Sequence, residues 1–165
     1  FAVGYELTKY GSSDATSTAP AARELDKDGQ LVFVGGNYDF EVVQLFAEAQ
    51  YFKHQTAINT NEQGEATVFG KDALGLKGYG LHLGAAAPLG AGTLTAGLYY
   101  VDYSEEFDAA ADQDYKFYGV SARYNYPLSE RTSLYAGAGY GQTKADDSGD
   151  KDQLTQVYCG LVHTF

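Results

Sequence analysis

The sequence predicts an all-β protein made of eight antiparallel strands that run up and down in chain order. Three observations indicate this fold: apolar residues recur at every second position, short and long connections alternate, and glycine and tyrosine are abundant. The chain of 165 residues contains 20 Gly and 15 Tyr but only 3 Pro. Because aromatic residues are enriched in strands, this composition favours many strands over a helical bundle.

Alternation with a period of two defines the strands in order. In the clearest segment, 42–54, one face is apolar and the opposite face carries Gln44, Glu48, Gln50 and His54. A helix would wrap these apolar residues around much of its surface, whereas a strand places them on one side. The segment 31–39 fits least well, because Leu31 and Phe33 fall on its polar side. The expected strands are 2–10, 31–39, 42–54, 81–89, 93–101, 116–126, 133–141 and 156–165.

The connections alternate between tight and long. Tight turns are expected at 38–41, 88–92 and 127–131, and long polar loops at 11–30, 55–76, 104–114 and 145–152. Up-and-down strands with one short-turn end and one long-loop end are typical of a transmembrane antiparallel β-barrel. Tyrosines near both ends of the apolar faces suit the two interfaces of a bilayer. They are Tyr51, Tyr100, Tyr118, Tyr124, Tyr126 and Tyr140. A water-soluble β-sandwich is the alternative, but its strands are usually shorter and connected crosswise.

Three stretches resemble the general porins of Gram-negative bacteria, and most closely the betaproteobacterial type. They are residues 31–54, residues 78–104 with the turn "PLGAG", and residues 131–165 with the ending "GLVHTF". The resemblance covers nearly the whole chain but only the carboxy-terminal half of a sixteen-stranded porin barrel. It therefore implies one domain, 1–165, that is incomplete on its amino-terminal side.

The resemblance implies a passive diffusion channel for small hydrophilic solutes and ions, an integral multi-pass barrel of the bacterial outer membrane. Its implied partners are outer-membrane lipid and lipopolysaccharide, two further copies in a homotrimer, and the barrel assembly machinery. A complete eight-stranded barrel that acts as an anchor or adhesion protein is the alternative. The glycines on the polar face would leave such a narrow barrel underfilled, which favours the larger porin.

A channel wall needs polar groups that replace the hydration of solutes, and fixed charges that set ion preference. Arg123 and Glu48 are expected to contribute most, although both could instead pair with groups outside this sequence. The expected pore-lining residues are Gln44, Glu48, Gln50, His82, Tyr99, Ser121, Arg123 and Tyr135.

The last strand carries apolar residues at alternate positions and ends on an aromatic carboxyl terminus. By resemblance, Val157, Cys159, Leu161 and Phe165 form the signal read by the assembly machinery. His163 departs from this pattern, since an apolar or aromatic residue is more usual there.

The remaining chemistry argues against other function classes. A net charge of −11 disfavours nucleic acid as a partner, because phosphate binding needs clustered Lys and Arg. The single cysteine excludes an internal disulfide. The histidines 54, 82 and 163 lie on separate segments without ligand spacing, so we expect no metal site, no cofactor and no enzymatic activity. Acidic residues gather in the loops 104–114 and 145–152, where they are expected to form a solvated rim.

Overall fold

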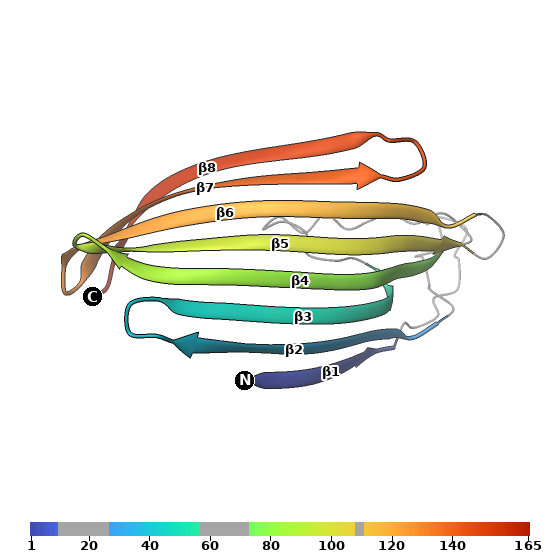
Figure 1. Cartoon of the computed structure of the whole chain (residues 1–165), viewed down its shortest axis with the longest axis horizontal. Helices are drawn as coiled ribbons and strands as arrows, with labels where there is room; N and C mark the ends of the chain where they lie inside the picture. Colours follow the sequence, from blue (N-terminus) through green and yellow to red (C-terminus); the bar gives the residue numbers. More distant parts are fainter. Residues whose placement is uncertain (10–26, 57–72, 108–110) are drawn as a thin grey trace, which may run out of the picture.

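A computed structural model describes residues 1–9, 27–56, 73–107 and 111–165 of the chain. These residues form a single sheet of eight strands, each antiparallel to the next, in the order β1 to β8. The strands β1 and β8 lie at opposite edges of the sheet (Figure 1). Within the described residues these two edge strands do not pair with each other, so the sheet is an open wall.

The predicted class is therefore confirmed, and all eight expected strands are present. Their bounds are β1 Ala2–Thr8, β2 Gly29–Asp39, β3 Gln44–Gln55, β4 Ala73–Leu89, β5 Gly92–Phe107, β6 Gln113–Ser129, β7 Thr132–Ala145 and β8 Lys151–His163. Among the described residues, no helix is long and apolar enough to cross a membrane.

Three tight connections lie at one end of the sheet, where β2 meets β3, β4 meets β5, and β6 meets β7 (Figure 1). In the first, the amide of Phe40 donates to the carbonyl of Val43 at 2.9 Å. Gly90 has a φ of 61°, a left-handed conformation that suits glycine in a two-residue hairpin turn. The expected loops 11–30 and 55–76 lie largely outside the described residues.

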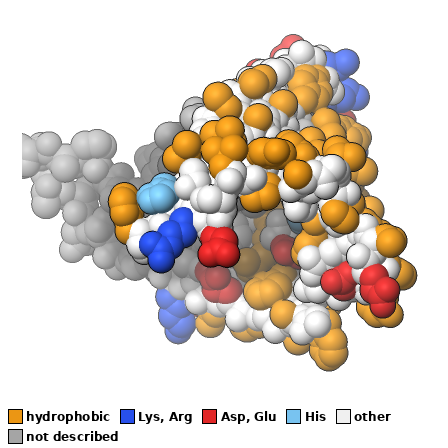
Figure 2. Space-filling model, turned by 90° about the vertical axis from the view of Figure 1, so that its left-hand side faces the viewer, with side chains coloured by type: hydrophobic (Ala, Val, Ile, Leu, Met, Phe, Trp, Pro, Cys, Tyr) orange, Lys and Arg blue, Asp and Glu red, His pale blue; other side chains and the backbone are white. Residues whose placement is uncertain are grey.

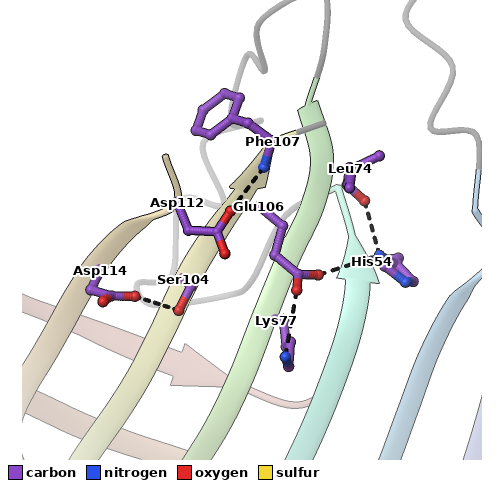
Figure 3. Close-up of polar contacts among 8 residues, drawn as sticks. All are labelled: His54, Leu74, Lys77, Ser104, Glu106, Phe107, Asp112 and Asp114. Atoms are coloured by element: carbon purple, nitrogen blue, oxygen red, sulfur yellow. Dashed lines mark hydrogen bonds and ion pairs between the residues drawn. The ribbon is translucent and has the colours of Figure 1, made fainter. Parts of the chain in front are cut away.

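The strands at the opposite end are longer than the sequence predicts. The expected loop 104–114 is wrong in its bounds, since β5 continues to Phe107 and β6 begins at Gln113. Polar cross-strand contacts support this extension: the Ser104 hydroxyl donates to Asp114 at 2.5 Å, and the amide of Phe107 donates to Asp112 at 3.2 Å (Figure 3). The loop expected at 145–152 is likewise shorter, since β8 begins at Lys151.

His54 does not lie on the polar face with Glu48, as its place in the sequence suggests. The register between β3 and β4 shifts between Phe52 and Gln55, and His54 has a φ of 53°. This bulge interrupts the alternation, as an extra residue in one strand does. The buried His54 ring instead contacts the carbonyl of Leu74 at 3.1 Å and the carboxylate of Glu106 at 3.6 Å (Figure 3).

A small apolar cluster lies near the loop end of the sheet. Its buried members are Phe52, Leu76, Val101 and Phe117, and Leu31, Tyr103 and Phe107 pack against it. Leu31 thus lies on the side that the sequence assigns to polar residues, because it pairs with Phe52 in the neighbouring strand. Burial of apolar area at this end stabilises the pairing of the long strands.

Candidate functional site: the inner face of the sheet

The strand register places all eight expected pore-lining residues on one face, called here the inner face. Directly paired residues of neighbouring strands share a face, and every second residue of a strand lies on the same side. Glu48 pairs with His82, which pairs with Tyr99. Gln50 lies two residues from Glu48 along β3 and therefore on the same face. Gly97 lies two residues from Tyr99 along β5, and its partner in β6 is Ser121.

A second row completes the set. Gln44 pairs with Ala86, Ala86 with Thr95, and Thr95 with Arg123. Tyr135 follows on β7, two positions from Gly137, the partner of Arg123. The inner face therefore combines one acidic and one basic residue of the expected set with amide, hydroxyl and aromatic groups. Their role in lining a pore stays a prediction.

The opposite face, called here the outer face, is apolar and exposed. Over residues 134–141 of β7 and 156–161 of β8, the outer residues are exposed and their inner neighbours are half-buried, as expected for the convex side of a curved sheet. Figure 2 looks onto the tight-turn end and shows the curved sheet around a hollow, with hydrophobic side chains along much of the outer margin. Exposed aliphatic residues of this face are Leu81, Leu83, Leu98, Val120, Val157 and Leu161.

Tyrosines border this apolar face at both of its ends. Toward the loop end, the rings of Tyr79 and Tyr100 lie 6.0 Å apart, and those of Tyr100 and Tyr118 lie 5.2 Å apart. Toward the tight-turn end, Tyr124 and Tyr126 lie 6.5 Å apart. Tyrosine combines an apolar ring with a polar hydroxyl, so these two borders match the aromatic girdles of a membrane barrel.

On the inner face, several expected residues contact one another. The His82 and Tyr99 rings stack with centroids 4.6 Å apart and an interplanar angle of 3°. The hydroxyl groups of Tyr99 and Ser121 are hydrogen-bonded at 3.3 Å. The guanidinium carbon of Arg123 lies 4.4 Å from the centroid of the Tyr135 ring, a cation–π contact.

The other expected residues are held less closely. Gln44 donates from its amide to Asn37 at 3.2 Å. A Cβ atom added at Gly80 would lie 2.8 Å from the side-chain Nε2 atom of Gln50, so the Gln50 side chain lies over this glycine. Glu48 is exposed, beside its paired residue His82. The arrangement can present a carboxylate and a guanidinium to water while aromatic contacts keep the guanidinium in place.

The glycines of the inner face provide space for the rings of neighbouring strands. A Cβ atom at Gly137 would lie 2.5 Å from the Tyr158 ring, and one at Gly160 would lie 2.5 Å from the Tyr135 hydroxyl. Aromatic rings that cover cross-strand glycines in this way stabilise sheets. Tyr158 is thus an inner-face residue that the expected pore list omits. The alternation of Tyr158 with Cys159 in the sequence indicates its face, but its pairing with Gly137 follows only from the strand register.

Three of the four residues expected to form the assembly signal lie on the outer face of β8, and the fourth follows the strand. Val157, Cys159 and Leu161 lie on the outer face, paired with Ala138, Ala136 and Leu134 respectively. Phe165 follows β8 and is fully exposed. The His163 ring is hydrogen-bonded to the Thr132 hydroxyl at 2.9 Å and lies 4.9 Å from the Phe165 ring. Their role as an assembly signal stays a prediction.

Among the described residues, no group of three or more His, Cys, Asp or Glu could hold a metal ion. The described residues of the inner face therefore form no metal centre.

An antiparallel up-and-down sheet with an apolar outer face, two tyrosine borders and a polar inner face defines the wall of an outer-membrane β-barrel. A family model described as Gram-negative porin matches residues 1–147. The chain therefore belongs to the Gram-negative porin family, a family of outer-membrane channels rather than enzymes. A comparison with curated proteins found no match.

Proposed function

We propose that the chain forms part of the wall of a water-filled channel for passive diffusion of small hydrophilic solutes and ions. The observation that carries this proposal is the division between the two faces. The expected polar residues share the inner face, and most of the exposed aliphatic residues, such as Leu81, Leu98 and Val120, share the outer face. A membrane barrel requires this division, because lipid-facing and lumen-facing residues alternate along each strand.

In this proposal the sheet is part of a larger closed barrel that spans the outer membrane many times. Backbone groups at an open edge are costly in lipid, so β1 and β8 need partners. We further propose that the complete barrel has sixteen strands in a single domain, that it assembles as a homotrimer, and that the barrel assembly machinery delivers it. The match to the porin family supports these features, because they are general properties of porins. An eight-stranded anchor is disfavoured, because the described parts of β1 and β8 lie at opposite edges.

Removing the charge of Arg123 or Glu48 is expected to shift the ion selectivity of the channel in opposite directions. A unit charge about 8 Å from an ion in water contributes roughly 0.5 kcal/mol, which corresponds to roughly a twofold change in permeability ratio. Arg123→Ala should favour cations and Glu48→Gln should favour anions. Reversal potentials across a planar bilayer with a salt gradient measure both shifts.

Leu98→Ala on the outer face is the matched control and should leave the reversal potential unchanged. Absence of any conductance from the folded wild-type protein would contradict the channel itself. Conductance with unchanged selectivity in both charge variants would instead remove Arg123 and Glu48 from the pore wall.

A further inference from the structure

The stacked rings of His82 and Tyr99 on the inner face leave part of their aromatic surface exposed. The two rings come from neighbouring strands and both extend over Gly97. A Cβ atom at Gly97 would lie 3.2 Å from the Nε2 atom of His82 and 2.9 Å from the Tyr99 hydroxyl. Tyr99 is 39% exposed although one side of its ring stacks on His82. Under the proposed function, this aromatic pair presents ring surface to passing solutes.

The guanidinium group of Arg123 lies on the same face, displaced toward the tight-turn end. Arg123 is two residues from Ser121 along β6, and the Ser121 hydroxyl is hydrogen-bonded to the Tyr99 hydroxyl. Two residues of a strand span about 7 Å. Arg123 is exposed, and within the described part of the chain it forms no ion pair. The Tyr135 ring contacts one face of the guanidinium, so the N–H donors at its edge can still bind an anion.

The charges on the two sides of the aromatic pair have opposite signs. Glu48 of β3 pairs with His82, whereas Arg123 lies on β6, on the far side of Tyr99. Three strand spacings separate β3 from β6, which is about 14 Å. An anionic solute is therefore repelled on the Glu48 side of the rings and attracted on the Arg123 side. This polarity orients the negative charge of such a solute toward β6.

We propose that Tyr99, His82 and Arg123 form a binding site for small aromatic carboxylates that pass through the channel. This inference rests on the proposed function and deepens it by naming a solute class. The ring of a benzoate-sized solute lies against the exposed surface of Tyr99, and its carboxylate accepts hydrogen bonds from Arg123. The ring, the carboxylate and one hydrogen bond of about 2.8 Å together bridge the separation between the two groups. Stacking selects the aromatic ring, and the planar guanidinium selects the carboxylate.

The test compares two anions of equal charge and similar size in planar-bilayer recordings of the folded full-length protein. Benzoate has an aromatic ring and cyclohexanecarboxylate has a saturated one, and both are used at a pH at which they are fully ionised. The reversal potential with one anion on each side of the bilayer gives their permeability ratio. The wild-type channel should favour benzoate about threefold, the size of effect expected from one aromatic stacking contact.

Two kinds of variant separate the ring contact from the charge contact. Tyr99→Leu should abolish the preference for benzoate, and Tyr99→Phe should retain it, because the ring rather than the hydroxyl contacts the solute. Arg123→Gln should lower the permeability of both carboxylates relative to potassium about fivefold, since a charge-assisted hydrogen bond is lost. This loss exceeds the roughly twofold shift expected for chloride, which responds only to the field of the charge.

Tyr140→Leu is the matched control, because Tyr140 lies on the outer face, paired with Val120. It should keep the wild-type permeability ratio. Equal permeability of both carboxylates in the wild type, a preference that survives Tyr99→Leu, or equal shifts for chloride and the carboxylates in Arg123→Gln would overturn the proposal. Channels that conduct potassium chloride without this preference contradict only the aromatic site, whereas absence of conductance contradicts the proposed function.

Discussion

Gly78→Ala is expected to prevent stable pairing of β4 with β5. A Cβ atom at this position would lie 2.2 Å from the carbonyl oxygen of Asp102 and 2.7 Å from the Cα atom of Tyr103. These are backbone atoms of the neighbouring strand, so no rotation of a side chain relieves the overlap. Phe52, which pairs with Gly78, and Leu76, two residues from Gly78 along β4, are the best-buried members of the apolar cluster and would be displaced.

We expect a loss of about 3 kcal/mol in the free energy of unfolding, the upper part of the range for overpacking. The chain contains no Trp, so urea unfolding is best followed by circular dichroism and by the shift in electrophoretic mobility on heating. Gly139→Ala is the matched control, because its nearest neighbours, the Cβ atom of Ser121 and the carbonyl oxygen of Val120, would lie at 3.7 Å. It should be neutral or stabilising by about 0.5 kcal/mol. Equal losses in both variants would contradict the register described for β4 and β5.

Leu98→Arg is expected to destabilise the protein in a bilayer by about 2–4 kcal/mol, the cost of a charged residue near the middle of a lipid-facing surface. Leu98 is 58% exposed on the outer face, between the tyrosine borders. On a water-facing surface, replacing the same exposed side chain by arginine would change the free energy of unfolding by no more than about 0.5 kcal/mol. The variant therefore separates a lipid-facing surface from a solvated one.

Ser121→Arg serves as the control for Leu98→Arg, because Ser121 lies on the opposite face at a similar depth, paired with Gly97. Unfolding in lipid vesicles should show a small effect for Ser121→Arg and a large one for Leu98→Arg. A negligible effect of Leu98→Arg would contradict the assignment of the outer face to lipid.

The periodicity of the sequence predicts the strands and their faces well, since alternate side chains of a strand must point to opposite sides. The expected inner-face residues, from Glu48 to Tyr135, share one face for this reason. The ends of the strands were less predictable. Polar residues such as Ser104 and Asp114 look like loop residues in the sequence, yet they pair across β5 and β6.

Features that depend on neighbouring strands could not be predicted from one sequence. The bulge that moves His54 toward Glu106 arises from a shift between β3 and β4, which local patterning does not encode. The position of the Tyr158 ring over Gly137 likewise depends on register. Register follows from the lengths of the connections and the packing of both faces, so it becomes visible only in the folded sheet.

The central claim is that adjacent residues of one strand face water in the channel and lipid outside it. Ser121→Cys and Val120→Cys test it directly in a Cys159→Ser background, which removes the single native cysteine. A charged, water-soluble thiol reagent added during planar-bilayer recording should reduce the single-channel current of Ser121→Cys and leave that of Val120→Cys unchanged. A reduced current for Val120→Cys with an unchanged current for Ser121→Cys would contradict the account.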